Sequence, residues 1–294
     1  MRPDTAPHPR DIQRDIHARP DIGLTARVIQ GNELRIASVH LERNALIVVD
    51  KGIKTVTTGD GVRVRATPGQ ALVVRGAQTV DFTNVLASDG TYEARWLIFD
   101  DALLLDERYR RDATSAGRAA AERQSVVAIG KVGGQFHASF EAAREALSPV
   151  DLVPEGVARL RVLEVAYWLL ARGVALAPHA ARTSVAARIR HLIAADVDAS
   201  WPSAIVSGRL AMSEATLRRR LSAEGTSLTE VVADVRMTTA LTMLQATSRP
   251  ISDVAMSVGY ESPSRFSVRF RERFGFSPSA VRDPDRGDRS ERGA

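Results

Sequence analysis

The sequence lacks several features that would point to particular classes of protein. None of its 294 residues is cysteine, which excludes disulfides, thiolate chemistry and zinc held by cysteine. No apolar run approaches the roughly 18 residues that a membrane-spanning helix needs. The first residues are polar and rich in proline, unlike a signal peptide. These absences predict a cytoplasmic protein.

Histidine is scarce where a metal site would need it. His40 is the only histidine between residues 22 and 99, and one imidazole cannot hold a metal. We interpret His40 as a partly buried strand residue with a satisfied hydrogen bond. The sequence also lacks a Gly-rich phosphate loop, a Gly-x-Ser-x-Gly elbow and a supported carboxylate pair. We therefore expect neither catalysis nor a metal or other cofactor.

Arginine and a normal share of apolar residues make up much of the chain. Of its 40 basic residues only Lys51, Lys54 and Lys131 are lysine, and the net charge is +5. Positive charge is compatible with nucleic-acid binding but does not by itself indicate it. A chain of 294 residues with 44% hydrophobic content suits two domains, each with its own core.

The N-terminal third of the chain has the pattern of a β-rich domain. Residues 1–20 are rich in proline and charge, which predicts a flexible arm. After them, short β-branched or alternating segments are separated by turn formers, and Thr58–Gly61 and Thr67–Gly69 are typical hairpin turns. Several strands with no intervening helix favour a sandwich or barrel. The predicted strands are residues 34–41, 45–49, 54–57, 62–66, 71–74, 80–84 and 92–99.

The middle of the chain is predicted to be mainly helical. A strand over residues 125–129 precedes a helix over 136–147 and a second helix that follows Pro154 and ends near Arg172. The second helix is apolar on two faces, so more than one face must be buried. Two interpretations stay open: both faces pack within the monomer, or one forms a homodimer contact. The residues assigned to that contact are Leu160, Leu163, Tyr167 and Leu170.

These patterns divide the chain into an α+β arrangement of two domains. Residues 21–173 are predicted to be a regulatory and dimerisation domain, and residues 174–183 a linker that contains Pro178. A helix over 184–196 opens an all-helical domain that ends near residue 282. Residues 283–294 are predicted to be a disordered tail.

The C-terminal domain contains a first basic helix at about residues 213–224. Ser213 is suited to be its N-cap, and Leu217 and Leu221 lie one turn apart on a face that would be buried. The segment 203–210 before it is short and apolar in pattern. A short apolar helix joined by a tight turn to a basic helix is typical of a helix-turn-helix.

A second basic helix at about residues 262–274 repeats this design. Ser262 is its expected cap, and Pro263 occupies the first helical position. The segment 251–258 precedes it, and Gly259 allows the tight turn between the two. Three phenylalanines at i, i+4 and i+8 define its buried face, namely Phe266, Phe270 and Phe274.

A long amphipathic helix over residues 227–247 is predicted to join the two units. At 1.5 Å per residue it would be about 30 Å long, close to the roughly 34 Å between successive major grooves on one face of DNA. From Ser203 to Arg282 there are eleven arginines against seven acidic residues. The alternative for such charge is an ordinary solvated helix surface. The outward residues assigned to DNA are Ala215, Thr216, Arg218, Arg219, Arg220, Ser264, Arg265, Val268, Arg269 and Arg271.

At these residues the sequence resembles the AraC/XylS family of bacterial transcription regulators. The resemblance covers roughly residues 183–282, and one position departs from it: Val268 stands where the family usually has arginine. The stretch Pro68–Val74 is similar to a short motif of the cupin-like sensor domains of that family, in which a glycine and an acidic residue precede apolar residues. Gln70 stands here in place of the usual acid. The matching runs are Met212-Ser213-x3-Leu217-x-Arg219, Ile251-x2-Val254-Ala255-x2-Val258-Gly259-Tyr260, Phe266-Ser267-x2-Phe270-x3-Phe274-Gly275 and Ser277-Pro278-x3-Arg282.

The resemblance implies a cupin-like β-barrel or sandwich followed by a domain with two helix-turn-helix units. It implies a DNA-binding regulator that is not an enzyme and that inserts both basic helices into successive major grooves. The expected partners are double-stranded DNA, a second copy of the chain, RNA polymerase and a small-molecule or protein effector at the N-terminal domain. The alternative function is a sensor or adaptor that acts mainly through protein contacts, with weak or lost DNA binding.

Overall fold

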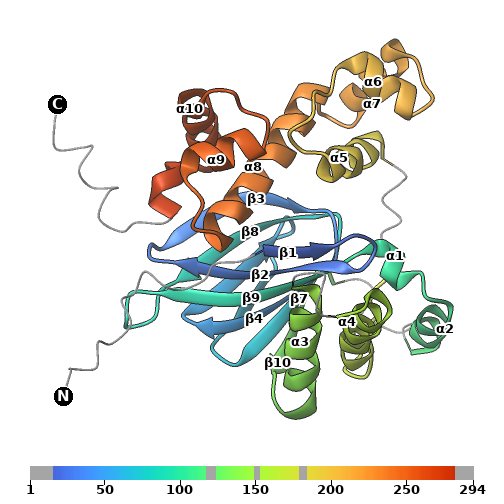
Figure 1. Ribbon diagram of the computed structural model, residues 1–294, viewed down its shortest axis with the longest axis vertical. Coiled ribbons are helices and arrows are strands. Elements are labelled where there is room, and N and C mark those ends of the chain that lie inside the picture. The colour runs from blue at the N-terminus through green and yellow to red at the C-terminus, as the bar shows by residue number, and fades with distance from the viewer. Residues whose placement is uncertain (1–15, 117–123, 149–152, 179–183, 282–294) are drawn as a thin grey trace.

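Two antiparallel sheets form the N-terminal half of the chain (Figure 1). The computed structural model describes residues 16–116, 124–148, 153–178 and 184–281. The larger sheet has the strand order β1-β2-β9-β4-β7-β10 and the smaller one β3-β8-β5-β6. The strands are β1 (Ile16–Arg19), β2 (Gly23–Gln30), β3 (Leu34–Leu41), β4 (Ala45–Lys51), β5 (Ile53–Thr58), β6 (Arg63–Ala66), β7 (Gln70–Val74), β8 (Gln78–Val85), β9 (Tyr92–Phe99) and β10 (Val126–Lys131).

The two sheets pack face to face, with the larger sheet as the middle of three layers. Strand β4 explains why: Ile47 and Val49 enter the core between the sheets, whereas Leu46 and Val48 enter a second core on the opposite face. The expected β-rich fold is confirmed as a sandwich. The barrel alternative is wrong, because within the described strands no ladder joins the two sheets.

In the described part of the N-terminal domain, four helices cover the outer face of the larger sheet. Phe136, Phe140 and Leu163 lie in the core that these helices share with the sheet. Helix α4 also buries Ala158, Val162 and Ala166 there, whereas its Leu160 is exposed. The helices are α1 (Asp101–Leu104), α2 (Glu107–Ala116), α3 (Gly134–Leu147) and α4 (Glu155–Leu170).

Strand β1 corrects the prediction for the end of the N-terminal arm. Ile16–Arg19 pair with Gly23–Ala26 of β2, so these four residues are an edge strand and not a free arm. A strand this short depends on its neighbour, and the sequence pattern had not singled out β2 either. Residues 1–15 of the arm, 179–183 of the linker and the tail 283–294 lie outside the described residues.

The start of the predicted linker is part of the N-terminal core. Val174 and Leu176 are buried against the same cluster as α3 and α4. The backbone N–H of Leu176 donates to the Tyr109 hydroxyl at 2.9 Å. These contacts fix the chain where it leaves the sandwich.

Six helices and one 3₁₀ turn make up the described part of the C-terminal domain, residues 184–281. Ser184, Ser213, Ser227 and Ser262 each cap a helix by accepting a backbone N–H, as the sequence predicts for Ser213 and Ser262. Gly275 ends the last helix with φ of 82°. The elements are α5 (Val185–Ala195), α6 (Ser203–Arg209), α7 (Glu214–Ala223), α8 (Leu228–Ala246), α9 (Ile251–Ser257), α10 (Pro263–Phe274) and the 3₁₀ turn Pro278–Val281.

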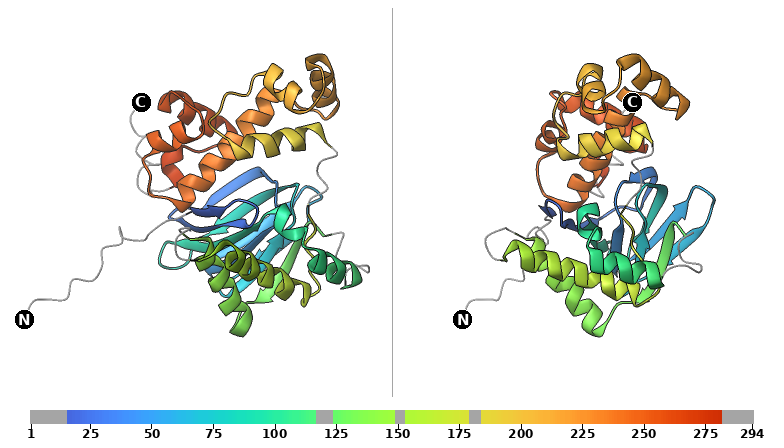
Figure 2. Two further views of the ribbon diagram at one scale, coloured as in Figure 1. Left: turned by 45° about the vertical axis from the view of Figure 1, so that its right-hand side comes forward. Right: turned by 90° about the vertical axis from the view of Figure 1, so that its right-hand side faces the viewer.

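The C-terminal helices lie across the opposite side of the strands from α1–α4 (Figure 2). The first half of α8 shares a core with α5, α6 and α7. Its second half shares a core with α9, α10 and the interior of the sandwich. No helix within the described ranges is long and apolar enough to cross a membrane.

Candidate nucleic-acid interface

Helix α7 presents a basic face to solvent. Leu217 and Leu221 are buried in the first unit's core, as the one-turn spacing predicts. The hydroxyl of Thr216 is engaged at the cap, where it accepts a hydrogen bond from the Ser213 hydroxyl at 2.9 Å, and this side chain is half-buried. The other assigned residues of this helix are exposed, namely Ala215, Arg218, Arg219 and Arg220.

Helix α10 has the same arrangement. Its three phenylalanines are buried and pack ring against ring, with centroids 5.6 Å apart for Phe266 and Phe270 and 4.7 Å apart for Phe270 and Phe274. Arg269 forms an exposed ion pair with Glu272 at 3.0 Å, one turn along the helix. All five assigned residues of this helix are exposed: Ser264, Arg265, Val268, Arg269 and Arg271.

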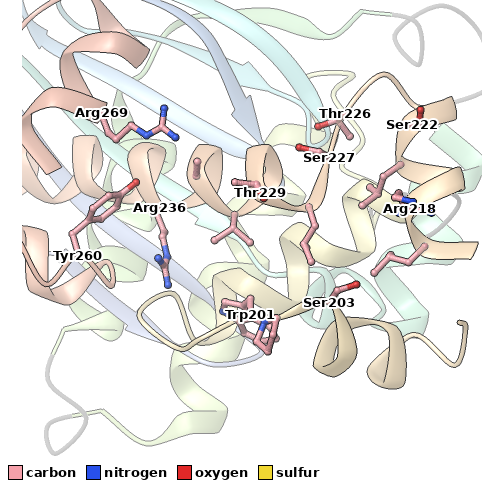
Figure 3. A pocket seen from close by; sticks show the side chains of 16 residues that line it. Trp201, Ser203, Arg218, Ser222, Thr226, Ser227, Thr229, Arg236, Tyr260 and Arg269 are labelled. Atoms are coloured by element: carbon pink, nitrogen blue, oxygen red, sulfur yellow. The ribbon is translucent and has the colours of Figure 1, made fainter. Parts of the chain in front are cut away.

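A groove of about 830 Å³ lies between the two units, with α8 along it (Figure 3). Arg218 of α7 lines one end and Arg269 of α10 the other, so the two basic helices contribute to one concave surface. Arg236 of α8 lines the groove between them. Among the described residues that line it, none is acidic. The arrangement therefore concentrates positive potential on one side of the domain.

Arg273 belongs to α10 but not to this surface. Its guanidinium forms an ion pair with Asp234 of α8 at 2.9 Å. It also donates to the backbone carbonyls of Ala37 at 3.1 Å and Ser38 at 2.6 Å, both in β3 of the sandwich. Arg273 follows the exposed Arg271 by two residues on the same helix, but these bonds place it at the contact between the domains.

The four residues assigned to a dimer contact do not share one exposed face. Leu160 is 67% exposed, but Leu163 is only 7% exposed and packs in the core of its own chain. Tyr167 packs edge-on against Tyr109, with ring centroids 5.3 Å apart, and donates to Asp112. Leu170 is half-buried. Leu163 is thus unsuited to a dimer contact, because it is buried in the core of its own chain.

A buried lysine in the sandwich was not anticipated from the sequence. Lys54 of β5 is 1% exposed, and its ammonium donates to Asn84 at 3.1 Å. It lies 4.0 Å from the ring centroid of Phe82 and 5.1 Å from that of Trp96. Burial lowers the pKa of Lys54 to about 7. No carboxylate in the described part of the chain hydrogen-bonds to it, so its charge depends on one amide and the aromatic rings.

Lys54 lines a small cavity that α8 closes. The cavity measures about 30 Å³, and Thr238, Leu241 and Gln245 of α8 form one wall. Two further polar atoms at its lining, Nε1 of Trp96 and Oγ1 of Thr238, are buried without a hydrogen-bond partner. Buried polar atoms without partners are rare, so this cluster needs an explanation.

His40 has the role expected of it. Its Nδ1 lies 3.0 Å from the Thr79 hydroxyl, and its Nε2 lies 3.3 Å from a carboxylate oxygen of Glu42. Burial raises the pKa of Glu42 to about 7, although Arg190 of α5 opposes the shift. These groups form a polar contact between the sandwich and α5.

The fold and the exposed surfaces define the class of protein as an antiparallel sandwich joined to a helical domain with two helix-turn-helix units. Residues 206–283 match the helix-turn-helix domain family. The transcriptional regulator SirC of Salmonella typhimurium is 35% identical over 91 residues, which are 31% of each chain. The virulence regulon transcriptional activator VirF of Shigella flexneri is 30% identical over 99 residues, 34% of this chain and 38% of that one.

The chain spans about a third of the length of these curated relatives. A solved structure of ToxT from Vibrio cholerae aligns with 88% of this chain and 97% of its own, with a TM-score of 0.60 and 14% identity. That likeness confirms the predicted two-domain fold. Residues 206–283 thus match a helix-turn-helix domain of the AraC type, and the resemblance that the sequence motifs predict is confirmed.

Proposed function

We propose that the chain is a sequence-specific DNA-binding transcription regulator that inserts α7 and α10 into successive major grooves. The observation that carries the proposal is the shared groove, in which Arg218 of α7 and Arg269 of α10 lie at opposite ends with the first half of α8 between them. Helix α8 has 19 residues, hence a length of about 28 Å. This length is commensurate with the roughly 34 Å between successive major grooves.

The exposed side chains divide by chemistry into base readers and phosphate ligands. Arg218 and Arg219 are suited to bidentate contacts with guanine. Val268 is suited to an apolar contact with a thymine methyl, as are Ala215 and the methyl group of Thr216. Ser264 and Arg265 at the start of α10 complete the reading face. The arginines suited to phosphates are Arg220, Arg269 and Arg271.

The salt dependence of DNA binding tests this proposal. The full chain would be titrated against an operator selected from random duplex DNA, at several salt concentrations. Three arginine–phosphate contacts predict a slope of log K against log salt of about −3 or steeper. Hydroxyl-radical footprinting should show two protected major grooves on one DNA face. A shallow slope with no sequence preference would support the adaptor function instead, and a single protected groove would show that α10 does not read DNA.

Control by an effector follows from the buried lysine. ToxT has been solved with an unsaturated fatty acid and with (E)-4-(8-methylnaphthalen-1-yl)but-3-enoic acid, both carboxylic acids with apolar tails. In this chain the Lys54 cavity joins a cation without a carboxylate partner to apolar side chains, among them Phe82 and Leu241. A ligand carboxylate there would supply the missing counter-charge. The proposed effector is therefore an organic carboxylate with an apolar tail.

The size of the cavity couples such binding to the DNA-binding domain. A space of about 30 Å³ holds little more than a water molecule. A larger ligand must displace Thr238, Leu241 or Gln245 of α8 to reach Lys54. Because α8 joins the two basic helices, its displacement changes their relative placement.

Decanoate is a suitable probe for this site, with decanol as its uncharged counterpart. Decanoate should raise the melting temperature of the full chain and change its operator affinity, whereas decanol should do neither. Lys54→Met should abolish the response. Lys51→Met is the matched control, since Lys51 is an exposed lysine three residues away that pairs with Asp89. A Lys54→Met protein that still responds to decanoate would rule out this site.

Dimerisation through α4 is a third element of the proposal. Val157 and Leu160 lie one turn apart and are 39% and 67% exposed. Leu160→Glu should shift the full chain from dimer to monomer in sedimentation velocity, while Leu105→Glu, at a 51% exposed leucine in the turn after α1, should not. A monomeric parent chain at micromolar concentration would contradict dimerisation. The proposal also includes RNA polymerase as a partner, in the cytoplasm. Transcription from the operator-bearing DNA with purified polymerase, with and without the full chain, tests that partner.

A further inference from the structure

Arg236 lies where the two halves of the C-terminal domain meet. It follows Val235, which packs in the core of the first helix-turn-helix unit, and precedes Met237, which packs in the core of the second. It is near the middle of α8 and half-buried. Figure 3 shows its side chain between Tyr260 and Trp201.

The guanidinium of Arg236 binds backbone carbonyls from both units. Its Nε donates to Val197 at 3.2 Å and its Nη2 to Ala199 at 2.8 Å, both in the connection between α5 and α6. Its Nη1 donates to Gly259 at 3.2 Å, in the turn between α9 and α10. Each of its three nitrogens therefore has an acceptor, and the acceptors come from the two separate helix-turn-helix units.

We infer that Arg236 is a positioning residue that sets the distance and angle between α7 and α10. The rigid, planar guanidinium directs its donors along fixed lines, so the carbonyls that it binds are held in one relative placement. Arg236 does this for the turn before α10 and the connection before α6. No other described part of α8 donates a side-chain hydrogen bond to both units.

The turn at Gly259 is built around this contact. Gly259 has φ of 77°, a conformation that favours glycine. A Cβ at this position would lie 2.6 Å from Nη2 of Arg236 and 2.9 Å from the backbone oxygen of Asp198. The absence of a side chain thus lets the guanidinium and both connections approach one another closely. The Tyr260 ring, 5.9 Å from the guanidinium carbon, packs beside it.

Lysine cannot replace arginine in this role. It would keep the positive charge, but one ammonium on a flexible stem cannot reproduce the fixed fork. Arg236→Lys and Arg236→Met should therefore both loosen the link between the units. Neither substitution changes a residue of α7 or α10, and Arg236→Lys also keeps the positive charge that this position contributes to the groove. In the Arg236→Lys protein each unit should therefore still read its own half of an operator.

The test rests on the proposed two-groove binding and compares three DNA duplexes. They are an operator selected with the full chain, the same operator with one half scrambled, and the same operator with one base pair inserted between the halves. For the parent chain, the insertion should weaken binding strongly. For Arg236→Lys, affinity for the intact operator should fall about tenfold, which corresponds to about 1.4 kcal/mol. Its affinity for the half-scrambled operator should change less than about twofold, and the inserted base pair should cost it less than it costs the parent.

Several results separate the possible outcomes. A general loss of stability would weaken binding to all three duplexes equally and lower the melting temperature, and it would overturn the positioning role. An Arg236→Lys protein that matches the parent, while Arg236→Met does not, would show that charge alone matters and would also overturn it. If the parent itself ignores the inserted base pair, the proposed two-groove binding fails instead. Thr239→Ala, a half-buried α8 residue near Arg236, should behave as the parent does.

Discussion

The two helix-turn-helix units share a local design but have different neighbours. The first closes its own core around Trp201, Leu217 and Leu221, together with the first half of α8. The second has no separate core, since Phe266 and Phe270 belong to the cluster that continues into the sandwich. The first unit therefore has a hydrophobic core separate from that of the N-terminal domain, whereas the second shares its core with that domain.

Polar contacts follow the same division. Arg273 of α10 binds the carbonyls of Ala37 and Ser38, where β3 is irregular and Ser38 has φ of 55°. Asn32 donates to Ala280 after α10 at 2.6 Å. The first unit contacts the sandwich through Arg190 of α5, whose Nε lies 3.7 Å from a carboxylate oxygen of Glu42. A conformational change in the sandwich should therefore affect the position of the second unit more strongly than that of the first.

Ala240→Pro should have the largest effect, because it breaks the helix that links the two units. Ala240 is fully buried in the second half of α8, and proline there costs about 3 kcal/mol or more. We expect footprinting to show loss of joint protection of two grooves, with circular dichroism to verify folding. Thr239→Ala should retain both the folded helix content and the joint protection of two grooves. An Ala240→Pro protein that protects two grooves as well as the parent would show that a continuous α8 is not needed.

Arg219→Ala tests the independent unit and should be the next largest in effect. It should cost about 1–3 kcal/mol of specific binding and relax base preference in one half of the operator, and Arg218→Ala should act similarly. Val268→Ala in the second unit should cost less, because it removes only an apolar contact. Titrations against the operator and against random DNA measure the difference. Equal weakening on both DNAs would mean that Arg219 contacts phosphate.

The sequence predicts these two faces well because their spacing is local. Phenylalanine at every fourth position and serine caps determine the bounds of α10 almost to the residue, and the strands 34–41 and 92–99 follow from alternation in the same way. The polar helix α2 was not predicted because it has no apolar stripe: Tyr109 is its one buried residue among those described. Its position depends on packing against α4.

The sites that sequence reasoning missed depend on distant parts of the chain. Lys54 lies in an ordinary alternating strand, and its burial follows from Phe82 and Trp96 on two other strands and from α8. Arg273 has the spacing of a surface arginine until Asp234 and β3 provide its partners. Neither partner set has a local sequence signal. Both residues lie at the contact between the domains, which no single element specifies.

Lys54→Met should stabilise the fold next to the second unit. The folded state lowers the pKa of Lys54 to about 7, so between about pH 7 and pH 10 the unfolded chain holds a proton that the folded chain lacks. The free energy of unfolding of the parent should rise with pH across that window. At about 1.4 kcal/mol per pKa unit, the shift from 10.5 to about 7 corresponds to about 5 kcal/mol, so methionine should remove this dependence and stabilise the fold at pH 7 by up to about that amount.

Urea unfolding of the parent and the Lys54→Met protein at pH 6, 7.5 and 9 measures this difference. The gap between the two proteins should be largest at pH 6 and should shrink as the pH rises. Lys51→Met is the control, because Lys51 is exposed. A gap that grows with pH would show that Lys54 is charged and well stabilised in the folded chain.

Arg273→Met should give the smallest effect and the sharpest contrast between the units. Loss of the bonds to Ala37, Ser38 and Asp234 should lower the free energy of unfolding by about 0.5–1.5 kcal/mol, since the guanidinium is partly solvated. Hydrogen exchange should become faster in β3 and at the end of α10, where the contact is lost. Exchange in α7 should stay unchanged, because the first unit has its own core.

Arg271→Met is the matched control for this prediction. It removes an exposed arginine two residues away on the same helix, so stability should change by less than about 0.5 kcal/mol. Its effect should appear instead in DNA binding, where the salt slope should fall by about 1. Faster exchange in α7 after Arg273→Met would show that the two units are one cooperative body. In that case the sandwich would influence both basic helices together, and the difference between the two cores would have no functional consequence.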